Sequence, residues 1–202
     1  MTRSDRASVE SVVLAFPESV RAATEFRSTW VVSSLEGLRA HGHYERYLKL
    51  LRGHRDEIVD CVAGAWLPMS VVRSHYEACD ALGLRADDVA RMARDGGTVR
   101  RTWHAHIISA AQRPDANVWY ILKQLHKIWL RGANGGAVGV FQLDHTRARV
   151  EYIGCELFDI PYFRLAAGAS IQFLGERVSQ DLRVSQHLGA ARASAVYLLE
   201  WS

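Results

Sequence analysis

The sequence has few cysteines and no long hydrophobic run. Its 202 residues include only three cysteines, Cys61, Cys79 and Cys155, at irregular spacing. This number is too small for the disulfide framework of a secreted domain. No segment resembles a secretory signal peptide, so we expect a reducing, cytoplasmic location. Charged residues interrupt every apolar stretch well before the roughly 18 residues of a membrane-spanning helix, and we expect no such helix.

Positive charge is also scarce in any one region. Lysine and arginine total 25 and aspartate and glutamate total 22, which gives a formal net charge of +3. Only Lys49, Lys123 and Lys127 are lysines, and the arginines alternate with acidic residues along the chain. A nucleic-acid-binding surface gathers its cations into a patch or groove. The sequence therefore predicts no nucleic-acid partner.

The signatures of common catalytic and nucleotide-binding sites are missing as well. The glycine-rich segment "RGANGGAVG" follows a predicted helix and precedes a predicted strand, whereas a phosphate-binding loop leads from a strand into a helix. No Gly-x-Ser-x-Gly elbow or cysteine-protease signature is present. The acidic pair Asp87 and Asp88 falls in a predicted first helical turn, where acids favour the helix dipole. We predict that the chain is not an enzyme.

The residues that are present describe a globular domain whose first half is helical. Hydrophobic residues make up 49% of the chain and charged residues 23%, as in ordinary globular proteins. From residue 30 to residue 131, apolar residues recur at three- and four-residue steps. Pro68 fits the first turn of a helix that ends near Gly83, and the pair Gly96–Gly97 predicts a break between two further helices. Asn117 is expected to cap the last helix of this half.

After Gly136 the pattern changes to short runs of β-branched and aromatic residues. A helix is predicted to begin near Pro161, between two pairs of strands. The four strands are expected near residues 137–143, 147–153, 181–187 and 194–201. The predicted fold is therefore α+β, with a helical N-terminal half followed by a ββαββ half that contains a four-stranded antiparallel sheet. We expect residues 1–25 to be a partly ordered N-terminal extension and residues 26–202 to form one domain.

Several segments resemble an uncharacterised paralogous domain family that is abundant in myxobacteria. They are "FRSTWVVSSLEGLRAHG", "WLPMSVVRSHYEACDALGL", "LHKIWLRGANGGAVGVF", "PYFRLAAG" and "YLLEW". The family has no assigned activity. Its element order is similar to that of a larger fold group, which comprises haem nitric-oxide-binding domains, four-vinyl-reductase domains and Golgi-transport adaptor subunits. The resemblance implies a pocket between helices and sheet that holds haem, an aromatic effector or an acyl chain.

The resemblance to haem domains makes a specific demand on two segments. It implies a histidine on the helix before the first strand pair and a Tyr-x-Ser-x-Arg motif that binds the haem propionates. His126 matches the histidine in position. The segment "YIGCE" keeps the tyrosine as Tyr152 but has Gly154 and Glu156 in place of serine and arginine, and a carboxylate would repel the propionates. We therefore predict that His126 is a helix-edge residue and that the chain holds no cofactor.

Two histidine motifs suggest metal binding, each weakly. His75 and Cys79 lie four residues apart in "HYEAC", which places both on one helical face and suits a pair of zinc ligands. No second tight pair of ligands exists in the sequence, and small buried cysteines are common in helical cores. In "HAH", His104 and His106 would point to nearly opposite sides of a helix. We predict no metal site, with zinc at His75 and Cys79 as the alternative.

The leading hypothesis is a non-catalytic module that binds or senses a small apolar or aromatic molecule. Five aromatic residues near the helix–sheet junctions are the candidate pocket residues: Trp129, Phe141, Tyr152, Tyr162 and Phe163. The alternative interpretation is that these side chains only fill the core. A second hypothesis is a protein-interaction module or a homodimer that docks through a helical face or through the terminal run "SAVYLLEW" as an edge strand. A haem-binding or metal-binding sensor is the third.

Overall fold

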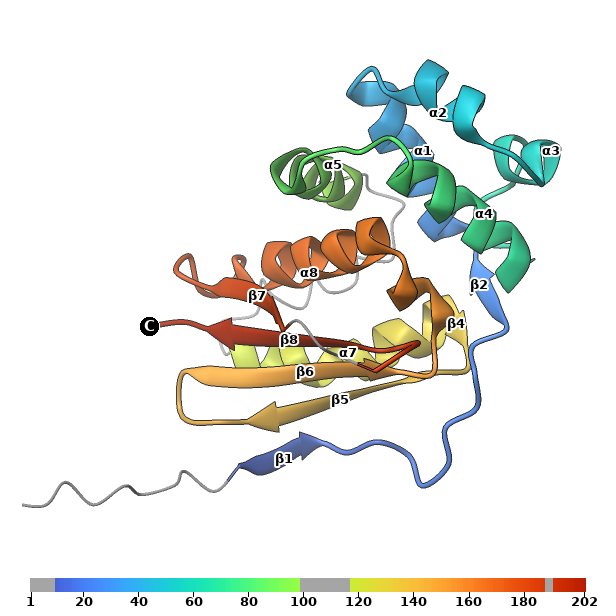
Figure 1. The fold of residues 1–202 in the computed structure, drawn as a ribbon. Coiled ribbons are helices and arrows are strands. Elements are labelled where there is room, and N and C mark those ends of the chain that lie inside the picture. The colour runs from blue at the N-terminus through green and yellow to red at the C-terminus, as the bar shows by residue number, and fades with distance from the viewer. Residues whose placement is uncertain (1–9, 99–116, 188–190) are drawn as a thin grey trace, which may run out of the picture.

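The structure is a computed structural model that describes residues 10–98, 117–187 and 191–202. Figure 1 shows the N-terminal helices packed as a layer over one long C-terminal helix, which in turn covers an antiparallel sheet. The predicted α+β class, with its helical N-terminal half, is confirmed. Within these described ranges, no helix combines the length and the apolar character needed to cross a bilayer.

The helical half begins after a short N-terminal segment. Its described helices are α1 (Thr29–Ala40), α2 (Tyr44–Leu50), α3 (Arg55–Val59), α4 (Met69–Asp80), α5 (Ala86–Thr98) and α7 (Val118–Gly132). Asn117 caps α7 as predicted, since its side-chain oxygen accepts a hydrogen bond of 2.9 Å from the backbone N–H of Tyr120. Gly83, with a φ of +61°, follows the end of α4.

Two details of the helical half differ from the sequence prediction. Pro68 precedes α4 as its N-cap and belongs to a short strand, so it does not occupy the first helical turn. The helix α5 includes Gly96 and Gly97 and ends at Thr98, one residue past the predicted stop, and the rest of the next predicted helix lies outside the described residues. Glycine lowers helix stability by only about 1 kcal/mol. The helix α5 packs against α1 and α8.

The C-terminal half follows the predicted ββαββ order. It contains β5 (Ala137–Gln142), β6 (Arg147–Ile153), a 3-10 turn η1 (Glu156–Asp159), α8 (Pro161–Gly175), β7 (Arg183–His187) and β8 (Ala195–Glu200). These four strands form the predicted antiparallel sheet, and a fifth strand, β1 (Ser11–Leu14), extends it in the order β1-β5-β6-β8-β7. The sequence prediction of four strands missed β1 because its four residues show no clear alternation of apolar and polar positions.

A second, smaller sheet joins the two halves of the chain. It consists of β2 (Glu25–Arg27), β3 (Trp66–Pro68) and β4 (Ala133–Asn134) in the order β3-β2-β4. Directly after β4, Gly135 has a φ of +102° and packs so closely against the N-terminal segment that an added Cβ would lie 2.3 Å from the carbonyl oxygen of Ala22. The glycine-rich segment is therefore a helix stop and a tight entry into the large sheet, and its order from helix to strand is the one that the sequence predicted.

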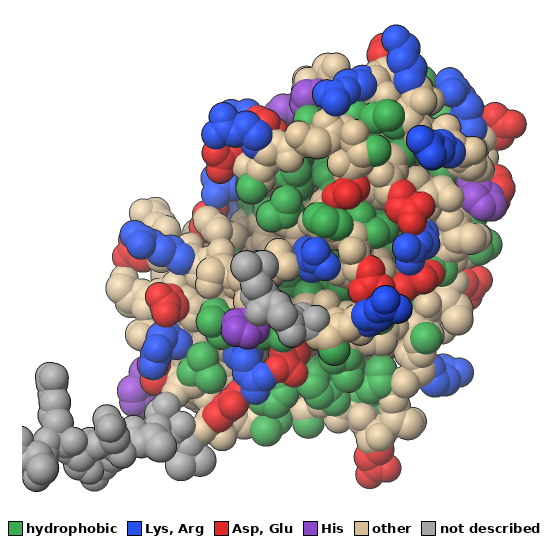
Figure 2. All heavy atoms as spheres, viewed as in Figure 1, with side chains coloured by type: hydrophobic (Ala, Val, Ile, Leu, Met, Phe, Trp, Pro, Cys, Tyr) green, Lys and Arg blue, Asp and Glu red, His purple; other side chains and the backbone are tan. Residues whose placement is uncertain are grey.

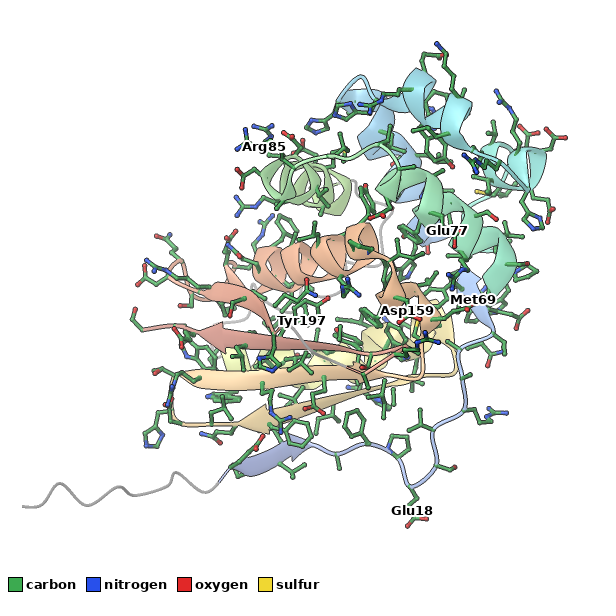
Figure 3. All side chains as sticks on the ribbon, viewed as in Figure 1. Glu18, Met69, Glu77, Arg85, Asp159 and Tyr197 are labelled. Carbon is green, nitrogen blue, oxygen red and sulfur yellow. The ribbon has the colours of Figure 1, made fainter. Side chains whose placement is uncertain are left out.

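The large sheet packs α7 and α8 against the same face. Tyr152 on β6 contacts Trp129 of α7, with ring centroids 5.2 Å apart. Tyr197 on β8 lies opposite Val150 on β6, so it shares that face. Figure 3 shows Tyr197 between its strand and α8, where its hydroxyl donates a 2.8 Å hydrogen bond to the carbonyl oxygen of Arg164. The core of the domain lies between this face and the helices.

Candidate functional site: a cavity between the helices and the sheet

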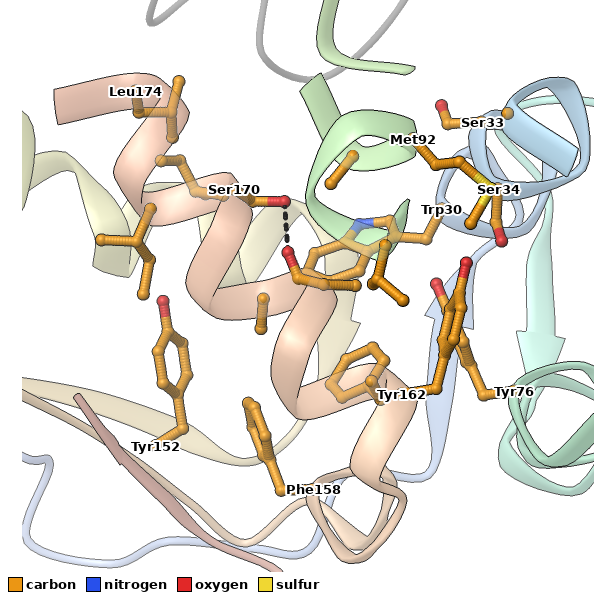
Figure 4. A pocket seen from close by; sticks show the side chains of 18 of the residues that line it. Trp30, Ser33, Ser34, Tyr76, Met92, Tyr152, Phe158, Tyr162, Ser170 and Leu174 are labelled. Atoms are coloured by element: carbon orange, nitrogen blue, oxygen red, sulfur yellow. Dashed lines mark hydrogen bonds between the residues drawn. The ribbon is translucent and has the colours of Figure 1, made fainter. Parts of the chain in front are cut away.

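A cavity of about 100 Å³ lies where the N-terminal helices meet α7, α8 and the sheet (Figure 4). Residues from α1, α4, α5, α7, β6, η1 and α8 line it, and most of their side chains are apolar or aromatic. Among the described residues, no lysine, arginine, aspartate, glutamate or histidine lines it. An engineered apolar cavity of roughly 150 Å³ is sufficient for benzene. The space therefore suits a small uncharged molecule.

Four of the five aromatic residues proposed from the sequence lie together at this cavity: Trp129, Tyr152, Tyr162 and Phe163. Trp129 and Tyr152 come from α7 and β6, and the other two come from the first turn of α8. These side chains are also buried in the core. The same rings therefore fill the core and form the cavity wall, so the pocket interpretation and the core-filling interpretation of these residues both apply.

Phe141 corrects the fifth assignment. Side chains alternate between the two faces of a strand, and Val138 and Val140 on β5 lie on the face that packs against the helices. Phe141 lies on the opposite face, where its ring is 6.0 Å from the ring of Phe16 and 4.4 Å from the guanidinium carbon of Arg149. Its sequence neighbours gave no indication of which face it would occupy. The structure does not bring Phe141 to the cavity.

Sequence reasoning missed several residues of the cavity wall. Most of them come from the N-terminal helices and from α8, and η1 adds one; they include Trp30, Tyr76, Met92 and Phe158. Trp30 stacks on Phe163 with ring centroids 6.1 Å apart, and Tyr76 meets the edge of Phe163 at 4.8 Å. The apolar stripes of α1, α4 and α5 were visible in the sequence. The pairing of those stripes with α8 was not, because it depends on contacts between residues far apart in the chain.

The hydroxyl groups of the cavity wall differ in how they are satisfied. Ser170 donates a 2.8 Å hydrogen bond to the carbonyl oxygen of Ala166 within α8. Tyr162 interacts through its hydroxyl with Ser34 and Cys79. The hydroxyls of Tyr76 and Tyr152, in contrast, form no hydrogen bond with any described residue. Burial raises the pKa of both phenols above the ordinary value, so both are neutral donors at physiological pH.

A buried polar chain lies behind the cavity wall on α4. His75 is fully buried, with its Nδ1 2.7 Å from the hydroxyl oxygen of Tyr47 and its Nε2 3.7 Å from the Sγ of Cys79. Burial lowers the pKa of His75 to about 3 and raises the pKa of the Cys79 thiol, so both side chains are neutral. Over the described part of the chain, no group of three or more His, Cys, Asp or Glu side chains is arranged to hold a metal ion. Zinc at His75 and Cys79 would therefore lack further ligands there.

A second, larger groove does not compete with the cavity as a binding site. It has a volume of about 360 Å³, is open to solvent, and runs between α5, α8 and β7. Its lining mixes polar and apolar side chains, and its arginines already have partners. Arg94 forms a 2.9 Å ion pair with Glu176, and Arg164 donates a 2.6 Å hydrogen bond to the carbonyl oxygen of Phe158.

The fold of the chain matches solved structures, although its sequence matches no family model and no curated protein. An H-NOX domain that carries 4-cyano-L-phenylalanine gives a TM-score of 0.60 at 10% sequence identity, over 87% of this chain and 96% of that one. An oxygen-binding H-NOX domain related to soluble guanylate cyclases gives 0.57 at 12% identity, over 87% and 94%. A variant of the T. tengcongensis H-NOX domain gives 0.57 at 11% identity, over 87% and 97%.

The chain has the H-NOX fold. H-NOX is the haem nitric-oxide-binding fold, one of the three members of the fold group that the resemblance implied from the sequence. At these sequence identities the match concerns the fold alone. Whether the cavity of this H-NOX-like domain suits haem has to be decided from its own residues.

The described residues do not fit a haem. His126 lies half-buried on α7 and is not part of the cavity wall, and no other described histidine lines the cavity either. No described cation faces the cavity to neutralise propionates, and Glu156 accepts a 3.0 Å hydrogen bond from Arg73. The space, about 100 Å³, is also far too small for a porphyrin, which is several times larger than benzene. His104 and His106 lie outside the described residues.

Proposed function

We propose that this domain is a non-catalytic module that binds a small, uncharged, largely apolar molecule in the cavity, without haem. The observation that carries the proposal is the cavity itself, about 100 Å³ between two layers of the fold, with an uncharged lining among the described residues. Transfer of an ion into such surroundings is very unfavourable unless the ion is paired. An apolar molecule of about the size of benzene meets no such barrier.

The cavity wall combines rigid and adaptable side chains. Trp129 is 2% exposed, and its indole N–H donates a 2.9 Å hydrogen bond to the carbonyl oxygen of Gly135, which fixes the ring. Met92 on α5 also lines the cavity and supplies a flexible, polarizable side chain. A ligand slightly larger than the cavity can therefore be accommodated by movement of Met92 while the aromatic wall stays in place.

A binding role agrees better with the side-chain chemistry than an enzymatic role. Cys79, which interacts with Ser34 and Tyr162 of the cavity wall, is fully buried, and its raised pKa keeps it protonated and a poor nucleophile. The described lining offers no acid or base that would be charged at neutral pH. We also propose a cytoplasmic location, which the free thiols of Cys61, Cys79 and Cys155 support.

Docking of a protein partner or a second copy through the terminal strand has no support. The sequence prediction treated "SAVYLLEW" as a candidate edge strand. In the sheet, β8 pairs with β6 on one side and with β7 on the other, so its backbone groups are already paired.

The molecular face shown in Figure 2 carries charges of both signs. On that face, Lys and Arg side chains alternate with Asp and Glu and do not gather into a basic patch of the kind that binds nucleic acid.

Binding of toluene tests the proposal directly. Trp30 and Trp129 line the cavity, so tryptophan fluorescence reports on its occupancy. We expect toluene to bind to the full chain and to raise its melting temperature as the ligand concentration increases. No saturable fluorescence change and no shift in melting temperature would refute the proposal.

A matched pair of variants on α8 locates the bound toluene. Ala167 lines the cavity, whereas Ala169 lines the open groove on the other side of the same helix. We expect Ala167→Leu to fill the cavity and abolish toluene binding, and Ala169→Leu to leave binding unchanged. Equal effects of the two substitutions would place the ligand elsewhere.

A further inference from the structure

One end of the cavity is polar. Figure 4 shows the hydroxyls of Ser34, Tyr76 and Tyr162 grouped at one side of the space, whereas the hydroxyl of Tyr152 stands apart at the other side. The rings of Tyr76 and Tyr162 lie 6.3 Å apart, and Tyr162 interacts with Ser34. Residues from α1, α4 and α8 therefore bring three hydroxyl groups to one place in a mostly apolar lining.

Within this polar end, Tyr76 has an unused hydrogen-bonding group. Its side chain is 4% exposed, and its hydroxyl forms no hydrogen bond with any described residue. A buried hydroxyl without a partner costs about 1–3 kcal/mol of stability, and buried polar groups in native proteins are nearly always satisfied. A phenylalanine at this position would pack equally well and avoid the cost. We therefore expect the hydroxyl of Tyr76 to find its hydrogen-bond partner in a molecule bound in the cavity.

The hydroxyl neighbours of Tyr76 define the chemistry of that partner. A phenol donates one hydrogen bond and also accepts, and so do the hydroxyls of Ser34 and Tyr162. A ligand hydroxyl placed among them finds both donors and acceptors. A charged group would find no counter-ion among the described lining residues. Tyr152 offers a second unpartnered hydroxyl, but no hydroxyl labelled in Figure 4 lies beside it.

We propose that the cavity ligand is an uncharged molecule with an apolar body and a hydroxyl group, and that this hydroxyl hydrogen-bonds with Tyr76 at the Ser34–Tyr162 end of the cavity. This inference rests on the proposed function and specifies its ligand class. Tyr76 is then the residue that selects for the polar group, while the aromatic wall around Trp129 and Phe163 binds the apolar body.

Phenol and toluene test the inference because they differ only in a hydroxyl that replaces a methyl group. In a wholly apolar cavity toluene binds more tightly, since phenol has to lose its hydration. We expect wild-type protein to bind phenol at least as tightly as toluene, measured by tryptophan fluorescence and calorimetry on the full chain. Tighter binding of toluene to the wild type would overturn the inference, and this readout needs no variant.

Two isosteric variants locate the hydrogen bond. We expect Tyr76→Phe to weaken phenol binding about fivefold to tenfold relative to toluene, the size of one hydrogen bond. Tyr152→Phe removes the other unpartnered hydroxyl and is expected to leave the phenol-to-toluene ratio unchanged. A ratio that is insensitive to Tyr76→Phe, or that changes only in Tyr152→Phe, would overturn the inference.

The melting temperatures of the free proteins provide a second readout. Without ligand, Tyr76→Phe is expected to melt at or above the temperature of the wild type because it removes an unsatisfied group. A lower melting temperature would show that the hydroxyl already has a partner in the protein or a bound water, and would overturn the inference.

The failure of the inference and the failure of the proposed function give different results. If toluene binds and phenol shows no dependence on Tyr76, the apolar binding function stands and the inference fails. If the wild-type protein binds neither molecule, the proposed function fails and the inference fails with it.

Discussion

Replacement of Trp129 by alanine should destabilise the domain severely. The indole of Trp129 contacts the rings of Phe26, Tyr152 and Phe158 at centroid distances of 5.6, 5.2 and 6.0 Å. Truncation of a buried tryptophan to alanine costs about 3–5 kcal/mol through lost packing and the cavity that remains. The carbonyl oxygen of Gly135 also loses its 2.9 Å hydrogen bond, which favours the upper end of that range.

The size of this effect can be measured by urea denaturation followed by far-UV circular dichroism, which does not depend on tryptophan signals. Domains are stable by about 5–15 kcal/mol, so Trp129→Ala should remove a large part of the stability. A loss of about 4 kcal/mol corresponds to a decrease in melting temperature of about 8–16 °C for a chain of this size. A loss below about 1 kcal/mol would refute the packing argument.

His126 is the matched control on the same helix. It is half-buried, lies outside the cavity wall and forms no hydrogen bond with a described residue. His126→Ala should change the free energy of unfolding by no more than about 0.5 kcal/mol. It should also leave toluene binding intact. If His126→Ala were as destabilising as Trp129→Ala, the assignment of His126 to the margin of α7 would be wrong.

Three further predictions concern haem, pH and backbone strain. Haemin added to the purified protein should produce no Soret band that depends on His126; a band that His126→Ala abolishes and other histidine variants retain would restore the haem sensor. Because burial lowers the pKa of His75 from 6.5 to about 3, the unfolded state binds the extra proton as pH falls below 6.5, so stability is complete above that pH and declines below it. The loss from pH 7 to pH 5 should be about 2 kcal/mol, and urea denaturation of His75→Gln should lack this component. Gly135→Ala should lower the free energy of unfolding by more than about 2 kcal/mol in the same assay, because the added Cβ would collide with Ala22. Gly42 also has a positive φ but has open space around it, so Gly42→Ala should lower it by about 1 kcal/mol. Equal losses in the two variants would contradict this account.

The sequence predicted the order of elements well because that information is local. The change of period after Gly136, the cap at Asn117 and the stop at Gly83 each act within a few residues. The β1 strand was missed because it is recognisable only by its pairing with β5, more than a hundred residues away. Local signals cannot supply such a contact.

Part of the cavity wall was predicted from local signals, and the rest was missed because it depends on long-range contacts. Trp129, Tyr152, Tyr162 and Phe163 could be identified because aromatic residues at helix–sheet junctions commonly line pockets. The misplacement of Phe141 arose from strand register, which fixes the face of every side chain and is set by pairing partners. Tyr76 was missed because its importance lies in an unsatisfied hydroxyl, which exists only once the helices are packed.

The pairing of β1 with β5 determines how far the chain can be truncated from its N-terminus without loss of sheet structure. Backbone hydrogen bonds of 2.7 and 2.8 Å also join Gly136 to Arg21 and Ala23 to Gly154, beyond the end of β1. A shorter recombinant chain that began at residue 26 would lose these bonds and would leave one side of β5 unpaired from Val140 to Gln142. Exposed strand edges recruit other chains and promote aggregation. Affinity tags and fusion partners are therefore best placed before Ser11, and N-terminal trimming should end there.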